Sequence, residues 1–259
     1  MRMKPFIVMP TYNEKENLEK MVRTLLALDC GLSVLIVDDN SPDGTGEIAD
    51  RLAVNLGGVY VRHREGKLGL GTAYRYGFRE AIDLGATCVF EMDADFSHGP
   101  EYVPEFLLAI LEHDVIIGSR YVPGGGTRNW SKLRELISRG GNLYTRLLTG
   151  LKIRDVTSGF RCYTKEVLES IDFDRIDASG YGFQVEMAYV CTSLGFDVHE
   201  LPIIFTDRVE GQSKMSNGIV LEAIRIVAGL RKKYRDLKPH PAAGAAPSEG
   251  RVEKTPADS

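Results

Sequence analysis

The stretch Thr87-Cys88-Val89-Phe90-Glu91-Met92-Asp93-Ala94-Asp95-Phe96-Ser97-His98 decides the fold that we expect. Its first part is short, apolar and β-prone, which is typical of a buried strand in a parallel sheet. Asp93 and Asp95 follow where that strand ends, and both point to one side because strand side chains alternate. In open α/β sheets, ligands bind outside the carboxyl ends of the strands. Two carboxylates at that position suit Mg²⁺ or Mn²⁺ held together with substrate phosphates, although two solvated acids in a turn would look the same.

The order of strand, polar cluster and helix recurs through the first half of the chain. We predict strands over residues 5–9, 32–37, 59–61, 87–92 and 114–117. Helices are predicted over about 15–26, 45–55, 71–84 and 102–112, with Thr45 as the cap of the second. This alternation indicates the α/β class, with a doubly wound, mostly parallel sheet flanked by helices.

The second half is less regular. Helices are expected over about 130–148, with an interruption at Gly140-Gly141, and over 165–171, 184–194 and 219–234. Residues 198–205 read as one strand, and Pro202 favours an edge position for it. From Pro239 onward Pro, Ala, Gly, Ser and Glu dominate, so we expect a single folded domain over residues 1–238 and a disordered tail over 239–259.

Composition excludes several classes of protein. The chain has 259 residues and a net charge of −4, so no overall field draws it to nucleic acid. Its four cysteines form no Cys-x-x-Cys pair, which favours reduced cysteines in a cytosolic protein over a zinc or redox site. No apolar window approaches the roughly 18 residues of a spanning helix, so we do not expect the chain to cross a membrane by itself.

A glycine-rich turn follows the third predicted strand. Its order, Gly66-x-x-Gly69-x-Gly71, is the reverse of the dinucleotide-binding G-x-G-x-x-G, and Lys67 precedes Leu68 where a phosphate loop needs Ser or Thr. A dehydrogenase is therefore disfavoured. Lys67 fits an anion contact at a helix N-terminus and a solvated turn equally well.

Several clusters together resemble the family 2 glycosyltransferases of the GT-A fold: Pro10-Thr11-Tyr12-Asn13-Glu14, Val37-Asp38-Asp39, Asp43-Gly44-Thr45, Asp93-Ala94-Asp95 and Gly118-Ser119-Arg120-Tyr121. Three later motifs resemble the dolichol-phosphate (polyprenol-phosphate) mannosyltransferases within that family: Asp155-Val156-Thr157-Ser158-Gly159-Phe160-Arg161, Gly180-Tyr181-Gly182-Phe183-Gln184-Val185-Glu186 and Arg208-Val209-Glu210-Gly211-Gln212-Ser213-Lys214. The resemblance covers roughly residues 5 to 235 in the right order, and the ordered set is highly specific.

The resemblance implies a GDP-mannose donor, a polyprenyl-phosphate acceptor and a divalent cation, Mg²⁺ or Mn²⁺. It implies that guanine and ribose are held by Pro10, Tyr12, Glu14, Val37 and Asp39. Asp93, Ala94 and Asp95 would lie at the diphosphate and metal, and Gln184 and Glu186 on the sugar or acceptor side. The expected product is polyprenyl-phosphate mannose, formed with inversion. Another sugar nucleotide such as UDP-glucose, or a non-catalytic module of the same fold, stays open.

The chemistry of this transfer explains the charged residues. An acceptor phosphate is already anionic near neutral pH, so it needs cations rather than a strong base. Arg120, Arg208 and Lys214 are the candidates for contact with donor or acceptor phosphates. Asp95 is the better metal ligand because we expect it to lie further out than Asp93. Some relatives carry Gln where this chain has Ser97, so the metal site would rest mainly on Asp95 and water.

A basic amphipathic segment offers a way to meet a lipid substrate. Between Arg128 and Arg154 seven basic residues accompany a single acid, Glu135, and apolar residues are interleaved with them. Such a helix indicates either a membrane-surface element or a core helix with a solvated basic face. We expect a peripheral enzyme on the cytoplasmic face of a membrane, with an integral membrane protein as a possible partner.

Overall fold

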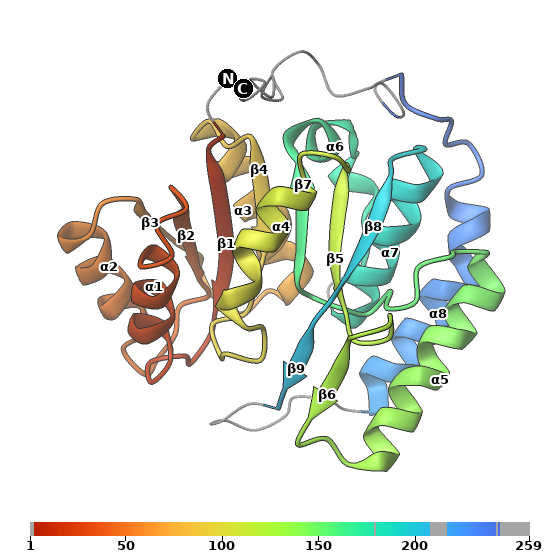
Figure 1. The fold of residues 1–259 in the computed structure, drawn as a ribbon, viewed down its shortest axis with the longest axis horizontal. Coiled ribbons are helices and arrows are strands. Elements are labelled where there is room, and N and C mark those ends of the chain that lie inside the picture. The colour runs from red at the N-terminus through yellow and green to blue at the C-terminus, as the bar shows by residue number, and fades with distance from the viewer. Residues whose placement is uncertain (1–2, 179, 208–216, 242, 244–259) are drawn as a thin grey trace, which may run out of the picture.

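A central sheet with helices on both faces forms the body of the computed structural model, which describes residues 3–178, 180–207, 217–241 and 243 (Figure 1). The strands of this sheet are β1 Pro5–Thr11, β2 Ser33–Asp38, β3 Val59–His63, β4 Cys88–Glu91, β5 Val115–Ser119, β7 Arg161–Thr164 and β8 Val198–Pro202. Their order is β3-β2-β1-β4-β7-β5-β8, and all neighbours are parallel except β7, which is antiparallel to β4 and β5. The predicted α/β class and mostly parallel sheet are confirmed.

Successive side chains of each strand enter two different hydrophobic cores. In β1, Phe6 and Val8 face one core, whereas Ile7 and Met9 face the other. The first core is covered by α3 (Leu70–Asp83), α6 (Lys165–Ser170) and α7 (Tyr181–Ser193), and the second by α1 (Leu18–Leu26), α2 (Thr45–Asn55) and α4 (Val103–Ala109). Burial on both faces explains why the strands read as continuous apolar runs.

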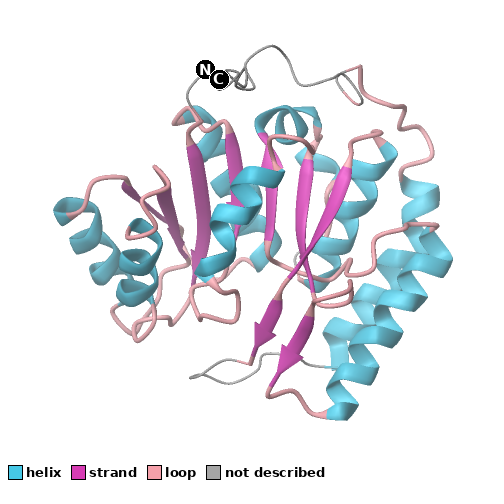
Figure 2. Ribbon diagram, viewed as in Figure 1, coloured by secondary structure: helices cyan, strands magenta, loops and turns pink. Residues whose placement is uncertain are grey.

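Two long helices lie side by side at one end of the sheet, in green and blue in Figure 1. They are α5 (Lys132–Thr149) and α8 (Asn217–Lys233), which contact one another, and α8 also packs on α7. Near the carboxyl ends of β5 and β8, β6 (Gly126–Arg128) and β9 (Ile204–Thr206) form a separate two-stranded parallel sheet (Figure 2).

Several predicted elements differ from the structure. Helix α5 continues through Gly140-Gly141, so the expected interruption is wrong. The strand expected over 198–205 divides into β8 and β9 after Pro202, although β8 does lie at the sheet edge as predicted. Helix α1 begins at Leu18 rather than Lys15, and the helix expected over 102–112 is a short 3₁₀ turn, Pro100–Tyr102, followed by α4. The sequence reading missed β7 and a second 3₁₀ turn, Phe173–Arg175.

Beyond α8 the chain packs against the turn between α7 and β8. The backbone N–H of His240 donates to the carbonyl of Leu194 at 2.7 Å, and the His240 ring stacks on Phe196 with centroids 5.8 Å apart. The first residues assigned to the tail therefore contact the domain. Most of the predicted tail, residues 242 and 244–259, lies outside the described residues.

Candidate active site

The residues singled out in the sequence line one edge of the sheet. Pro10 and Val37 are the penultimate residues of β1 and β2, whereas Tyr12 and Asp39 directly follow these strands and Asp93 to Asp95 follow β4. These three strands are adjacent and parallel, so their carboxyl ends meet at the same edge (Figure 1). Arg120 follows β5, two strands further along. Arg208 and Lys214 lie outside the described residues.

A buried carboxylate ties the loops after β1 and β2 together. Asp38 accepts hydrogen bonds from the hydroxyls of Thr11, at 3.0 Å, and Ser41, at 2.6 Å. The Ser41 hydroxyl in turn accepts from the backbone N–H of Asn13, which has a left-handed φ of 60°. Asp38 therefore shapes the Tyr12–Glu14 loop, while its neighbour Asp39 is left for other contacts.

A second tie fixes Glu14. The Thr45 hydroxyl donates to Asp43 at 2.6 Å and accepts from the backbone N–H of Glu14 at 3.0 Å. Gly44, with φ of 92°, occupies the N-cap position of α2 in place of Thr45, so the predicted cap is wrong. Thr45 is instead the first helical residue, and its hydroxyl is committed to the loop.

Asp39 and Arg64 form a buried pair at the β2–β3 end of the edge. Asp39 Oδ1 lies 3.3 Å from Arg64 Nε, and each side chain is 8% exposed. Burial raises the pKa of Asp39, and the Arg64 guanidinium offsets part of that rise. Asp39 Oδ1 and Arg64 Nη1 have no hydrogen-bond partner among the described residues. Buried polar atoms without a partner are uncommon in folded proteins, and a catalytic role or a bound molecule is one explanation for them.

Sequence reasoning missed Arg64. Its position three residues after the third predicted strand, at the same edge as Asp39, was the signal that could have found it. Arg64 also donates to the Thr72 hydroxyl at 2.7 Å, which fixes the guanidinium against α3. Nearby, the Lys67 ammonium lies 4.7 Å from the centre of the Tyr12 ring.

The acidic pair after β4 sits in a tight turn. Asp95 Oδ1 accepts from the backbone N–H of Ser97 at 3.0 Å, and Phe96 between them has a left-handed φ of 60°. That conformation is strained for a bulky residue and is characteristic of functional sites. Asp95 is 3% exposed whereas Asp93 is half-buried, so the expectation that Asp95 lies further out is wrong.

Two side chains hold Asp93. The Tyr74 hydroxyl of α3 donates to Asp93 Oδ1 at 3.4 Å. The backbone N–H of Asp93 donates to Nδ1 of His98, at 3.4 Å, and His98 is buried against Phe160. Burial and the nearby Asp93 and Glu91 carboxylates raise the pKa of Tyr74, so its hydroxyl stays protonated and remains a donor.

Two fully buried ionisable side chains, Glu91 and Arg161, lie beneath the acidic pair. Glu91 and Arg161 are direct partners in the β4–β7 ladder, and both are fully buried. Burial raises the pKa of Glu91 to about 7, against the opposing effects of Arg161, Gln184 and Tyr163. Arg161 also donates to the carbonyls of Val156 and Ser158, each at 2.8 Å. Sequence reasoning missed this cluster because it missed β7.

Arg120, directly after β5, forms a bidentate ion pair with Asp155. Its Nε and Nη2 donate to both carboxylate oxygens of Asp155, at 2.7 and 2.6 Å, and Nη2 also donates to Thr157. Trp130 and Phe205 rings lie beside the guanidinium, with centroids at 5.3 and 5.5 Å. Arg120 is 7% exposed, so a large part of its charge is balanced within the protein.

The two later motif residues separate in the structure. Gln184 is buried beside His98, since both lie near Gly159. Glu186 instead accepts from the Lys233 ammonium at 2.6 Å and the Tyr234 hydroxyl at 2.8 Å, so it joins α7 to α8.

The donor set suits a hard cation shared with a substrate. Among the described residues, no group of three or more His, Cys, Asp or Glu side chains could hold a metal ion. Mg²⁺ and similar ions are commonly held by one or two carboxylates plus substrate phosphates, which Asp93 and Asp95 could supply. The residues present therefore fit a cation that binds together with a phosphorylated ligand.

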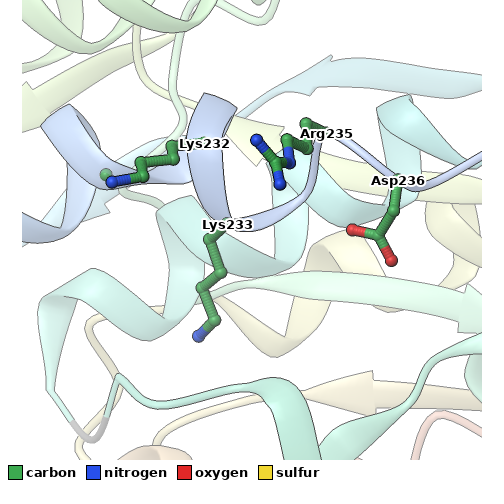
Figure 3. Close-up of a pocket in the computed structure, with 5 residues that line it drawn as sticks. Lys232, Lys233, Arg235 and Asp236 are labelled. Carbon is green, nitrogen blue, oxygen red and sulfur yellow. The ribbon is translucent and has the colours of Figure 1, made fainter.

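A separate cavity of about 520 Å³ lies at the C-terminal end of α8, lined by Gly229, Lys232, Lys233, Arg235 and Asp236 (Figure 3). Figure 3 shows the Lys232 and Lys233 side chains diverging. Lys233 is engaged by Glu186 and Asp177. Because the chain after α8 contacts the turn that precedes β8, this cavity lies away from the carboxyl ends of the strands.

Comparisons with known proteins agree with this geometry. The family model described as glycosyl transferase family 2 matches residues 6–172. The chain is 45% identical to an undecaprenyl-phosphate mannosyltransferase of Micrococcus luteus, over 91% of this chain and 98% of the relative. It is also 45% identical to a polyprenol monophosphomannose synthase of Mycolicibacterium smegmatis, over 87% of this chain and 86% of that protein.

Solved structures share the fold at low sequence identity. A mannosyltransferase from Pyrobaculum calidifontis in complex with GDP-Man and Mn²⁺ matches with a TM-score of 0.54 and 14% identity, over 89% of this chain and 70% of that chain. Mannosyl-3-phosphoglycerate synthase from Rubrobacter xylanophilus matches with a TM-score of 0.62 and 19% identity, over 90% and 74%. The predicted GT-A fold is confirmed, and the chain belongs to glycosyl transferase family 2.

Proposed function

We propose that this glycosyltransferase transfers mannose from GDP-mannose to a polyprenyl phosphate and yields polyprenyl-phosphate mannose with inversion. The observation that carries the proposal is the placement of Asp93 and Asp95 beside the Asp39–Arg64 pair at one sheet edge. The names of the two relatives at 45% identity support the sugar and the acceptor. The neighbour solved with GDP-Man supports the choice of donor.

The order of strands gives the donor a direction. Neighbouring strands lie about 4.8 Å apart, so β2 and β4 are separated by roughly 10 Å, comparable with the distance from base to diphosphate. We assign the nucleoside to Asp39, with Pro10, Tyr12, Glu14 and Val37 around it. Arg64, beside Asp39, lies at the same end.

The diphosphate then lies at Asp93, Ala94 and Asp95, where the two carboxylates would hold Mg²⁺ or Mn²⁺. When bound, the cation supplies charge neutralisation for the departing diphosphate. The chain's own part is to fix both carboxylates, which Ser97 N–H and the Tyr74 hydroxyl do. Ala94, between the two acids, is 2% exposed and packs in the second core, which anchors the turn that carries them.

The acceptor phosphate must approach a second anion. Because its second pKa is about 6, it is already a nucleophile near neutral pH. Arg208 and Lys214 are the cations that we assign to these phosphates. Arg120 already pairs with Asp155, so we expect it to act in part by shaping the corner formed with Thr157 and Trp130.

Helix α5 is our candidate for contact with the membrane that carries the acceptor. Its exposed face presents Leu133, Leu136, Ile137, Leu143, Leu147 and Leu148, with basic side chains between them. Within residues 3–178, 180–207, 217–241 and 243, no helix combines the length and the apolar character that crossing a bilayer requires. Each basic group adds about 1 kcal/mol of attraction to anionic lipid. We propose peripheral binding on the cytoplasmic face, alone or with an integral membrane partner.

The deciding experiment is transfer of labelled mannose from GDP-mannose to a short polyprenyl phosphate, with Mg²⁺, Mn²⁺ or EDTA. Metal-dependent, organic-soluble product is expected. Product from UDP-glucose but not from GDP-mannose would keep the reaction class and change the donor. If no donor gives product even after membranes are added, the chain is a binding module and the proposal is wrong.

A further inference from the structure

Tyr74 is a fully buried side chain whose single polar atom reaches the candidate active site. Its ring lies in the core between Phe78 and Phe183, with centroids 5.8 and 6.0 Å away. Its hydroxyl lies 3.4 Å from Asp93 Oδ1. Because the stacked rings hold the phenol in place, the hydroxyl has little freedom to turn elsewhere.

Two glycines bring the helix that carries Tyr74 unusually close to its neighbours. They stand three residues before and three after it, as Gly71 and Gly77, so each is a helical neighbour of Tyr74 on one of its two sides. A Cβ at Gly77 would collide with Val8 Cγ1 of β1. A Cβ at Gly71 would lie 2.6 Å from the carbonyl oxygen of Ala178.

The close approach accounts for Gly71, the last glycine of the turn that no nucleotide motif accounted for. A larger residue at Gly77 would push α3 away from β1, and one at Gly71 would push α3 away from Ala178; either shift would move the Tyr74 hydroxyl relative to Asp93. The stretch Gly71-x-x-Tyr74-x-x-Gly77 therefore acts as a spacer that sets where one hydroxyl meets one carboxylate.

We propose that Tyr74 is a positioning residue for the metal-diphosphate site, holding the Asp93 carboxylate in the orientation that binds a cation together with the donor. This inference rests on the proposed function, because it requires Asp93 to face the metal and the diphosphate. Partners that orient metal ligands typically change metal affinity about 10- to 100-fold when they are removed.

The test is Tyr74→Phe, which removes the hydroxyl and keeps the ring. Binding of GDP is measured by titration calorimetry on the full chain, with Mn²⁺ and again in EDTA. We expect GDP binding with Mn²⁺ to weaken about tenfold or more, while GDP binding in EDTA stays unchanged. The Mn²⁺ concentration that half-saturates transfer should rise by a similar factor.

Tyr234→Phe is the matched control, since it removes another buried phenol hydroxyl that donates to a carboxylate, Glu186, at 2.8 Å. It should leave both GDP titrations unchanged. The inference alone is overturned if Tyr74→Phe keeps the wild-type Mn²⁺ dependence, or if it weakens GDP binding equally with and without Mn²⁺. If wild-type protein binds no GDP under either condition, the proposed donor is wrong and this inference falls with it.

Discussion

Asp95 is the residue on which the proposed chemistry depends most. We predict that Asp95→Asn lowers turnover at least about a hundredfold. A neutral amide binds the cation more weakly than a carboxylate does, and that cation stabilises the leaving diphosphate by several kcal/mol. The amide oxygen can still accept from Ser97 N–H, so the turn should persist. Transfer assays with GDP-mannose and thermal unfolding measure the two effects separately.

The control for that substitution is Asp50→Asn, the same change at an exposed acid of α2 whose carboxylate lies 2.9 Å from His63 Nε2. Near-normal transfer by the Asp95 variant would show that Asp95 is not a metal ligand. A large fall in melting temperature would show that the buried carboxylate mainly supports the turn.

Arg64 should control the ionisation of Asp39. Burial raises the pKa of Asp39 and Arg64 opposes that rise, so Arg64→Ala should raise the pKa further. Asp39 accepts hydrogen bonds from GDP-mannose best when its carboxyl group is ionised. The KM for GDP-mannose should therefore increase on acidification, and in the variant the increase should begin at a higher pH.

Initial rates between about pH 5 and pH 8 test this shift, with Arg62→Ala as the control on the same strand segment. Arg62 pairs with Glu80 instead of Asp39. An Arg64 variant whose pH profile overlays that of the wild type would show that Asp39 does not bind the donor as a carboxylate.

At the residue scale, sequence patterns locate acids at strand ends but do not assign their tasks. Asp38 and Asp39 are adjacent and chemically identical, yet Asp38 accepts hydrogen bonds from Thr11 and Ser41 while Asp39 pairs with Arg64. That division depends on a partner 25 residues further along the chain. The burial of Asp95 likewise depends on how the Phe96 turn folds back, which spacing does not encode.

At the scale of single elements, helix α5 carries a testable surface. We predict that the double substitution Leu136→Glu and Leu147→Glu weakens binding to anionic vesicles at least tenfold. Each leucine that becomes buried in the lipid contributes about 1.5–3 kcal/mol to binding. The two side chains are 68% and 73% exposed, so the fold should not change. Vesicle co-sedimentation at low salt measures the effect.

The control is Val54→Glu, at an apolar position on α2 that is 85% exposed and lies at the other end of the sheet (Figure 1). If both variants reduce sedimentation alike, added charge alone is responsible. If the α5 pair leaves binding intact, the lipid surface lies elsewhere on the protein.

Element boundaries were predicted less well than element types, and α5 shows why. Two glycines cost about 2 kcal/mol in a helix, but Ser131 caps the start and Gly150 ends it in a left-handed conformation. Capping and packing on α8 override the local penalty. Strand β7 was missed because four residues containing a buried arginine have no apolar run; only the pairing with β4 and β5 makes them a strand.

At the scale of the whole molecule, the alternation of strands and helices was enough to predict the mostly parallel sheet. Each strand end supplied polar residues, and parallel pairing brought them to one edge. The antiparallel insertion of β7 was not predictable in this way, and it joins two halves of the site. Its Tyr163 donates to Glu91 on β4, and its Arg161 donates to the carbonyls of Val156 and Ser158, in the segment whose Asp155 holds Arg120.

The boundary of the domain is the last feature open to test. Sequence composition places it at residue 238, but His240 donates to Leu194 and stacks on Phe196. We therefore predict that a chain ending after Ala243 keeps wild-type turnover and melting temperature. A chain ending after Lys238 should keep turnover but lose about 1 kcal/mol of stability, the contribution of one hydrogen bond. Thermal unfolding compares the two. Equal melting temperatures would return the boundary to 238, and loss of transfer from either chain would show that the C-terminal segment serves the active site.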